Sequence, residues 1–138
     1  MDIHQVMTRG VETVSPGATL EFAAKKMLAR NIGFLPVIES EKVVGVVTDR
    51  DIVLRAVSAG LSPHMTTVRE VMTKTVISCR DDQTLTEASL AMEKNLVHRL
   101  VVFDQPGRLV GIVSLSDIAA KTKNERLTGH VLGKVVAA

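Results

Sequence analysis

Aromatic side chains are scarce in this sequence: its 138 residues include no Trp, no Tyr and three Phe. Proteins that bind single-stranded nucleic acid stack bases on several aromatic side chains along a basic groove. The net charge is only +2, and the one small basic cluster, Lys25, Lys26 and Arg30, is far from a continuous basic face. The pI of about 8.9 leaves a nucleic-acid-binding protein as an alternative, but the composition does not favour one.

Cysteine and long apolar runs are scarce as well. The single Cys79 cannot form an intramolecular disulfide, which predicts a reducing, cytoplasmic setting. Residues 1–10 contain no apolar run typical of a signal peptide, and no stretch approaches 18 consecutive apolar residues, so no membrane span is expected. The four His residues are scattered without metal-ligand spacing, and we therefore predict no metal site.

The most informative feature of the sequence is an internal repeat. Val6–Thr8 recurs as Val71–Thr73, a shift of 65 positions that also pairs Leu20 with Leu85. One additional residue enters in the loop Asp104–Arg108, and from there the shift is 66, so that Asp51 pairs with Asp117. Surface loops tolerate such insertions. The sequence therefore predicts two copies of one structural unit.

Each copy follows the order strand, helix, hairpin, helix. Apolar residues at helical spacing predict a helix over Thr19–Arg30, and Thr84–Glu87 has the spacing of a capping box that begins its counterpart. Short runs rich in Val and Ile predict two β-hairpins. The hairpin strands are expected at Phe34–Ile38 and Val43–Thr48, and at Arg99–Phe103 and Leu109–Ser114. The second helices are expected at Asp49–Ala59, ended by Gly60, and at Ser116–Lys123.

These elements divide the chain into four parts. We predict a first repeat over residues 1–60, a linker over 61–67, a second repeat over 68–123 and a C-terminal tail over 124–138. Residues 131–138 have two interpretations that the sequence leaves equal: a short helix used in a dimer contact, or a frayed terminus. The fold class is α+β, with two tandem β-α-β-β-α repeats.

A shared motif stands where the last strand of each copy meets the last helix. It contains Gly, two apolar residues, Thr or Ser, two variable residues and Asp, and it occurs as Gly45–Asp51 and Gly111–Asp117. Free N–H groups at the helix start suit a phosphate. Thr48 or Ser114 can add a hydroxyl donor, and Asp51 or Asp117 can accept ribose hydroxyls.

The same motif has a purely structural interpretation. Thr or Ser followed three residues later by Asp is also an ordinary helix N-cap, worth about 1 kcal/mol. For one isolated occurrence the cap would be the better interpretation. Two occurrences at the same point of an internal repeat, each after a strand that contains Gly, favour a binding site.

In the order in which they occur, these segments resemble the cystathionine β-synthase (CBS) domain, and the chain is similar to a tandem CBS pair, or Bateman module, over about residues 3–123. The segments that carry the resemblance are Val6–Thr8, Gly33–Ile38 and Val44–Ile52 in the first copy, and Val71–Thr73, His98–Val102 and Val110–Ile118 in the second. The second copy is especially similar to the nucleotide-binding repeats of the γ subunit of AMP-activated protein kinase.

The resemblance implies two repeats packed through their sheets with pseudo-twofold symmetry, and two clefts lined by both copies. The ligands would be AMP, ADP, ATP or S-adenosylmethionine, as regulatory ligands rather than required cofactors. Carried over by position, the residues of one cleft are Thr48 and Asp51, and those of the other are Ser114, Ser116 and Asp117. Residues at the start of each hairpin would line base or phosphate: Ile32, Gly33, Phe34, Val97, His98 and Arg99.

The copies differ at these positions, because Gly33 and Phe34 stand where the second copy has His98 and Arg99. Arg99 is the best phosphate partner, since its planar guanidinium matches phosphate oxygens. We therefore expect one cleft to bind a phosphorylated nucleotide and the other to be weaker, to be empty or to take a less charged ligand.

The predicted function is a non-enzymatic, ligand-sensing regulatory module that forms a homodimer and acts in trans on an unidentified protein. No nucleophile–base arrangement or phosphate-binding loop argues for an enzyme. A ligand-free dimerisation scaffold is the main alternative.

Overall fold

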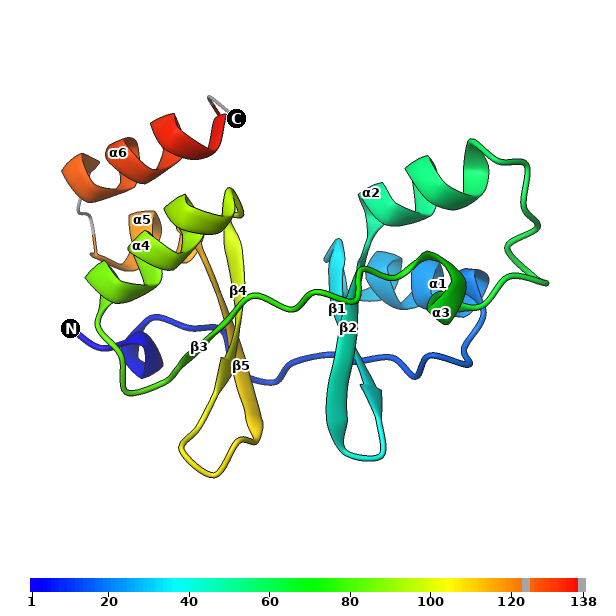
Figure 1. The fold of residues 1–138 in the computed structure, drawn as a ribbon, viewed down its shortest axis with the longest axis horizontal. Helices are drawn as coiled ribbons and strands as arrows, with labels where there is room; N and C mark the ends of the chain where they lie inside the picture. Colours follow the sequence, from blue (N-terminus) through cyan, green and yellow to red (C-terminus); the bar gives the residue numbers. More distant parts are fainter. Residues whose placement is uncertain (123–124, 137–138) are drawn as a thin grey trace. The chain divides into compact units, whose positions relative to one another are not determined.

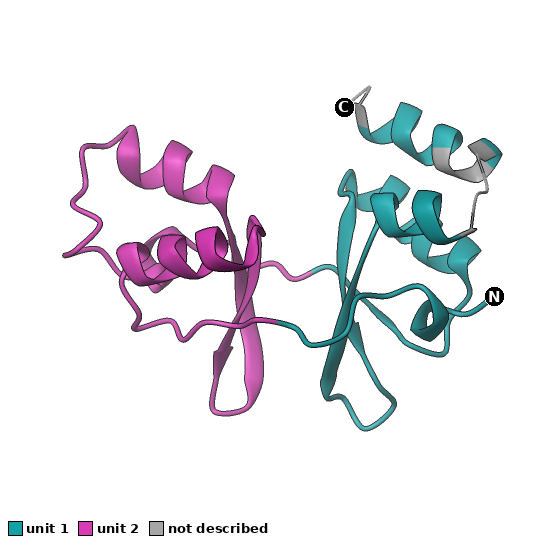
Figure 2. Ribbon diagram, turned by 180° about the vertical axis from the view of Figure 1, so that it is seen from behind, with its two compact units in different colours: residues 1–11, 77–138 teal, residues 12–76 magenta. Residues whose placement is uncertain are grey.

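The computed structural model describes residues 1–122 and 125–136. They form two compact units, each described separately below: unit 1 contains residues 1–11 and the chain from residue 77 onward, and unit 2 contains residues 12–76 (Figure 2). Each unit has its own cluster of buried apolar side chains. The mixed α+β class and the two repeats predicted from the sequence are confirmed.

Unit 2 is a β-hairpin with helices packed around it (Figure 1). Thr19 accepts a hydrogen bond from the backbone N–H of Phe22 and so caps the first helix at its predicted start. The hairpin pairs Phe34 with Thr48, at the predicted ends of its strands. The elements are α1 (Leu20–Arg30), β1 (Phe34–Glu39), β2 (Lys42–Thr48), α2 (Asp49–Ile52), the π-helical turn η2 (Val53–Val57) and α3 (Val68–Val71).

Unit 1 repeats this arrangement. Thr84 and Glu87 form the predicted capping box at the start of α4, and Arg99 pairs with Ser114 as Phe34 pairs with Thr48. Both hairpins have a register shift at equivalent positions, after Val37 and after Val102. The elements are the 3₁₀ turn η1 (Ile3–Gln5), β3 (Ser78–Arg80), α4 (Leu85–Asn95), β4 (Arg99–Phe103), β5 (Leu109–Ser114), α5 (Leu115–Thr122) and α6 (Glu125–Val136).

The first strand of the repeat is present in only one unit. In unit 1, β3 runs parallel to β4, and Asp81 continues the ladder by donating its N–H to the carbonyl of Phe103. In unit 2, the strand is reduced to a single bridge between Val14 and Val37. Pro16 stands where the second copy has Asp81 and has no N–H to donate, so the ladder stops there.

The compact units do not coincide with the sequence repeats, because the repeats exchange their first segments. Thr8, from the start of the first copy, forms a two-way backbone bridge with Ile112 of the second copy. Its counterpart Thr73 forms the same bridge with Val46 of the first copy. Each repeated Val-Met-Thr segment therefore pairs with the hairpin of the other copy. The sequence prediction did not include this exchange.

The two glycines of the shared motif make this exchange possible. A Cβ at Gly45 would lie 2.7 Å from the carbonyl oxygen of Thr73, and one at Gly111 would lie 2.6 Å from Sδ of Met7. At either distance a neighbour would have to shift: the backbone of Thr73 at Gly45, and the flexible end of Met7 at Gly111. The glycines therefore allow the exchanged segment to pass directly against the strand.

Further differences from the prediction include the ends of helices and the short elements η1 and α3, which were not predicted. The second helix of the first copy ends at Val57 rather than Ala59, and a turn follows to Gly60, whose φ of +70° is the left-handed conformation expected of a terminating glycine. The tail is helical, but its helix α6 begins at Glu125 and packs on α4 and α5 of its own unit. The predicted end of α5 at Lys123, and the last two residues of the tail, lie outside the described residues.

Candidate ligand-binding site

The Thr/Ser-x-x-Asp motif forms the same reciprocal cap in both units. Thr48 Oγ1 accepts from the backbone N–H of Asp51, and Asp51 Oδ2 accepts from the N–H of Thr48, both at 3.0 Å. Ser114 and Asp117 make the same two hydrogen bonds, also at 3.0 Å. The cap fixes both side chains where strand becomes helix, and it uses only one oxygen of each carboxylate. Capping and ligand binding are therefore compatible at this motif.

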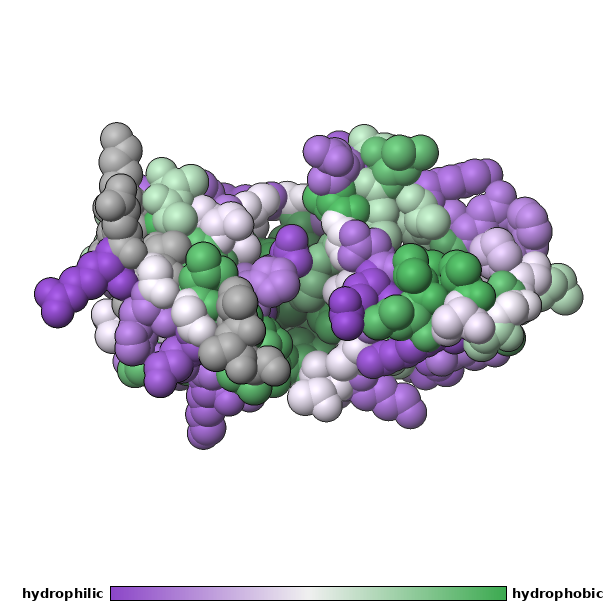
Figure 3. Space-filling model, turned by 90° about the horizontal axis from the view of Figure 1, so that it is seen from above, coloured by the Kyte–Doolittle hydropathy of each residue, from purple (hydrophilic) through white to green (hydrophobic). Residues whose placement is uncertain are grey.

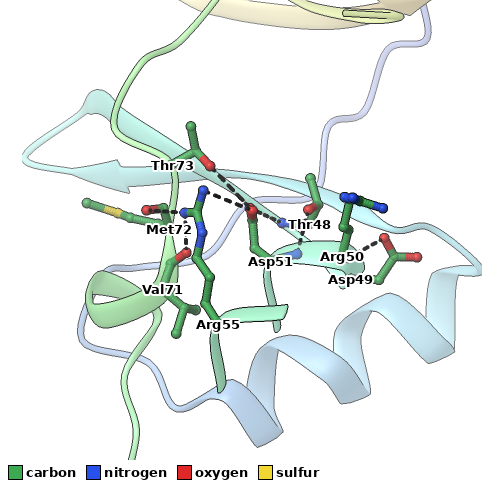
Figure 4. A network of polar contacts seen from close by, with 8 residues as sticks. All are labelled: Thr48, Asp49, Arg50, Asp51, Arg55, Val71, Met72 and Thr73. Carbon is green, nitrogen blue, oxygen red and sulfur yellow. Dashed lines mark hydrogen bonds and ion pairs between the residues drawn. The ribbon is translucent and has the colours of Figure 1, made fainter. Parts of the chain in front are cut away.

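In unit 2 the rest of the Asp51 carboxylate already has partners (Figure 4). The Arg55 guanidinium lies 3.6 Å from Oδ1, and the Thr73 hydroxyl lies 3.4 Å from both oxygens. Arg55 also donates to two backbone carbonyls at the end of α3. The Asp51 side chain is only 12% exposed. This carboxylate is already paired with Arg55 and Thr73 and largely covered before any ligand arrives.

In unit 1 the equivalent carboxylate is less engaged. The residue equivalent to Arg55 is Lys121, which donates to the carbonyl of Val6 at 2.7 Å and makes no ion pair with Asp117 among the described residues. Within the same part of the chain, Asp117 Oδ1 accepts no hydrogen bond. Asp117 is half-buried beside the exposed Ser116. One carboxylate oxygen at this junction is therefore available to a ligand hydroxyl.

The residues predicted at the start of each hairpin lie at the same junctions. In unit 2 the carbonyl of Gly33 accepts from the N–H of Asp49, and Phe34 pairs with Thr48. A Cβ at Gly33 would lie 2.5 Å from Asp49 Oδ2, so the exposed Asp49 carboxylate lies in the space that a side chain at this position would need. Ile32 lies beside them at the wall of a hollow described below.

In unit 1 the equivalent junction carries positive charge. The His98 carbonyl accepts from the N–H of Leu115, and Arg99 lies opposite Ser114 in the hairpin. An Arg99 guanidinium nitrogen is 3.0 Å from His98 Nε2. Burial, and then the nearby Arg99 charge, lower the pKa of His98. Val97 is half-buried next to them. A cation, an imidazole, a hydroxyl and a carboxylate thus occur together at this junction.

The structure brings the predicted residues of each repeat together and adds three that sequence reasoning missed. Asp49, Arg55 and Thr73 all line or contact the unit 2 junction. The spacing of four residues between Asp51 and Arg55 could have indicated their ion pair. Thr73 belongs to the repeated Val-Met-Thr segment, whose contact with the other copy only the three-dimensional fold reveals.

Within residues 1–122 and 125–136, no group of three His, Cys, Asp or Glu side chains is placed to hold a metal ion. In the same ranges no helix is long and apolar enough to cross a membrane.

Comparison with known proteins bears on this repeated arrangement. The model of the CBS domain matches the chain twice, at residues 3–58 and 68–123. The chain belongs to the CBS domain family. It is a CBS pair whose two repeats each carry the strand–helix junction described above.

Relatives of this CBS pair include both small proteins and enzymes. The CBS domain-containing protein YhcV of Bacillus subtilis is 37% identical over 133 residues, which cover 96% of this chain and 94% of YhcV. An inosine-5'-monophosphate dehydrogenase of Thermoplasma acidophilum is 36% identical over 118 residues, covering 86% of this chain but only 23% of that enzyme. This chain thus matches only the CBS-sized part of such an enzyme.

A solved CBS domain pair with bound ligands has the same fold. The pair from the protein MJ0100, in complex with 5'-methylthioadenosine and S-adenosyl-L-methionine, matches with a TM-score of 0.79 and 26% identity. The match covers 91% of this chain and 98% of that one. Adenosyl ligands are therefore bound by a close structural neighbour.

Proposed function

We propose that this CBS pair is a regulatory module that senses an adenine nucleotide or a related adenosyl ligand and acts in trans on another protein. The observation that carries the proposal is the unit 1 junction. Within the described residues Asp117 Oδ1 accepts no hydrogen bond, and Asp117 lies at the same strand–helix junction as Ser114, which pairs with Arg99 in the hairpin. The adenosyl ligands of the MJ0100 pair support the ligand class.

Each residue of this junction has a role that follows from its chemistry. Asp117 accepts hydrogen bonds from ribose hydroxyls. Ser114, Ser116 and the Arg99 guanidinium hold phosphate or another polar group. Val97 and His98 line the base or the phosphate. No cofactor and no catalytic group is required, because binding alone is the activity.

The unit 2 junction is the weaker site in this proposal. A ligand that binds Thr48 and Asp51 must compete with Arg55 and Thr73 for the carboxylate. Removing a buried carboxylate from its partners costs free energy that the ribose must replace. Ile32, Gly33 and Phe34 offer apolar contact and backbone groups but no cation. We expect this site to be empty or to take a less charged ligand.

Regulation follows as a shift between two conformations of the protein. The ligand can shift that equilibrium only by its difference in affinity for the two states. A CBS pair without a catalytic group then acts through a partner in trans or through its own homodimer. The buried free thiol of Cys79 fits a reducing compartment, and we place the protein in the cytoplasm.

Isothermal titration calorimetry tests the proposal. AMP, ADP, ATP and S-adenosylmethionine are titrated into the wild-type chain and into Asp117→Asn and Asp51→Asn. An Asn side chain can still accept the cap hydrogen bond, so both variants should fold. Asn lacks the negative charge that Asp offers to the ribose hydroxyls. One ligand should bind the wild type in the micromolar range, weaken at least about tenfold with Asp117→Asn, and change little with Asp51→Asn.

A second candidate function is a ligand-free homodimeric scaffold. Exposed apolar side chains on unit 1, Leu90, Leu96 and Leu132, favour it. For such a scaffold, sedimentation would show a dimer whose association state no ligand changes. Calorimetry would show no heat of binding with AMP, ADP, ATP or S-adenosylmethionine. That pair of results would replace the sensor proposal.

A further inference from the structure

In both repeats a basic residue stands four positions after the motif Asp. Arg55 of η2 donates to the carbonyls of Val71 and Met72, at 2.8 and 3.1 Å. Lys121 of α5 donates to the equivalent carbonyl of Val6 at 2.7 Å. In each unit, therefore, a cation on the helix that follows the motif holds the backbone of the exchanged Val-Met-Thr segment.

The two cations differ in what else they reach. While one guanidinium nitrogen of Arg55 binds the carbonyls, another lies 3.6 Å from Asp51 Oδ1 (Figure 4). A Lys side chain has a single nitrogen. In unit 1 that nitrogen binds the backbone, and Lys121 makes no ion pair with Asp117 among the described residues. The planar fork of Arg serves two groups of acceptors at once, whereas the ammonium of Lys serves one.

The hydroxyl of the exchanged segment adds to this difference. Thr73 is half-buried, and its hydroxyl lies 3.4 Å from both carboxylate oxygens of Asp51. Its counterpart Thr8 is exposed and, within the described ranges, donates no hydrogen bond to Asp117. Because Arg55 holds the backbone immediately before Thr73, it supports this second contact to the carboxylate as well.

The Asp51–Arg55 pair lies away from the exposed apolar surface of its own helix. Val53 and Val57, about one turn apart on η2, are 54% and 64% exposed, and Figure 3 shows apolar surface gathered over unit 2 on the right of the view. Arg55 lies midway between them in sequence and so about half a turn away around the helix. Figure 4 shows its side chain reaching the end of α3. A molecule on the apolar surface therefore does not need to contact the pair.

We propose that the basic residue four positions after the motif Asp determines how strongly each junction binds its ligand. Arg55 closes the carboxylate of unit 2, and Lys121 leaves that of unit 1 open. Arg55 is a positioning residue, because it acts on the ligand through Asp51. A ribose hydroxyl at Asp51 competes with an opposite charge 3.6 Å away, whereas at Asp117 it meets an oxygen that accepts no hydrogen bond from the described residues. This inference rests on the proposed sensor function.

Exchanging the two basic residues tests the proposal by calorimetry with AMP, ADP, ATP and S-adenosylmethionine. Arg55→Lys keeps a cation for the carbonyls at the end of α3 but withdraws it from Asp51, so binding at unit 2 should strengthen at least about fivefold. Lys121→Arg brings a guanidinium within reach of Asp117, so binding at unit 1 should weaken at least about fivefold. A merely structural role would not give opposite changes in affinity.

Matched controls make the same exchanges outside both junctions. Lys25→Arg and Arg30→Lys alter exposed side chains of α1 that pair with acids elsewhere on unit 2. Because each control keeps its charge and lies away from the motif, we expect both to bind ligand with the affinities of the wild type.

A double-mutant cycle in urea unfolding measures the pairs without ligand. Asp51→Asn and Arg55→Lys should be coupled by about threefold in the equilibrium constant of unfolding. Asp117→Asn and Lys121→Met should be additive, because these two side chains make no ion pair among the described residues.

The outcomes separate this proposal from the sensor proposal. If the wild type binds a ligand but both exchanges leave the affinities unchanged, this proposal is overturned and the sensor proposal stands. Additive effects of Asp51→Asn and Arg55→Lys would overturn it in the same way. If neither the wild type nor Arg55→Lys binds any of the four ligands, the sensor proposal fails and this one fails with it.

Discussion

Replacement of Gly45 by Ala tests the exchange of segments between the repeats. The new Cβ would lie 2.7 Å from the carbonyl oxygen of Thr73, so this backbone must move by about 0.7 Å to reach an ordinary contact of 3.4 Å. That carbonyl accepts from the N–H of Val46 at 2.9 Å, and the Thr73 N–H donates to the Val46 carbonyl at 2.8 Å. The movement strains both hydrogen bonds at once.

The expected loss of stability combines three terms. Overpacking costs about 1–3 kcal/mol, and each weakened hydrogen bond costs up to about 1 kcal/mol. The reduced freedom of the unfolded chain returns about 0.4–1 kcal/mol. We expect a net loss of about 2 kcal/mol in the free energy of unfolding. For a unit of this size, that loss lowers the midpoint of thermal unfolding by about 8–16 °C.

Differential scanning calorimetry of the ligand-free chain measures this shift, with two other glycines for comparison. Gly17→Ala should leave the midpoint almost unchanged, because no atom lies within 4 Å of the added Cβ. Gly111→Ala should fall between the two, since its nearest neighbour is the flexible end of Met7. A Gly45→Ala protein that melts with the wild type would refute the close crossing of Thr73 over β2.

Three further predictions concern single side chains. Arg55→Met should destabilise the protein by about 1 kcal/mol in urea unfolding, since a half-exposed charged donor to two carbonyls at the end of α3 is lost; an unchanged midpoint would show that these bonds contribute nothing. Because burial and Arg99 lower the pKa of His98, the unfolded chain takes up its proton first, and stability should fall as the pH drops below about 6.5. His98→Gln should remove that part of the pH dependence, and identical pH profiles would contradict the assignment. Burial raises the pKa of Cys79 to about 11, so its thiol should react with a disulfide reagent at pH 8 only after unfolding, and fast labelling of the native protein would be inconsistent with its burial.

Local structure was predictable because its causes are local. The caps of α1 and α4 depend on residues three positions apart, and the hairpins follow from short runs of β-branched residues. The repeat also explains why the two hairpins have equivalent registers, which the structure shows. A break in the repeat pattern also had a local cause, since Pro16 shortens the first strand of one copy.

The exchange of segments was not predictable, because it depends on contacts between residues more than 25 positions apart. The repeat shows that Val71–Thr73 and Val6–Thr8 are equivalent segments. It does not show which hairpin each segment pairs with. Gly45 and Gly111 were recognised as part of a binding motif, whereas the structure shows that they also give the crossing segment its space. The position of α6 required the packing of a whole unit.

At the candidate site, the sequence correctly brought together the cap and the start of the hairpin in each repeat. It did not reveal that Arg55 and Thr73 engage Asp51 while Asp117 keeps one oxygen without a described partner. The expected inequality of the two sites was based on the residues at the start of each hairpin, Gly33 and Phe34 in one copy against His98 and Arg99 in the other. The structure adds a second physical reason for it, the difference between the two carboxylates.

Amide chemical shifts, measured by NMR on the isotopically labelled chain with and without the ligand selected by calorimetry, test the central claim most directly. The account predicts that the largest shift changes occur at His98, Arg99 and residues 114–118, with smaller changes at residues 48–52. Changes confined to residues 48–52, or no changes at saturating ligand, would contradict the assignment of sensing to the Asp117 junction.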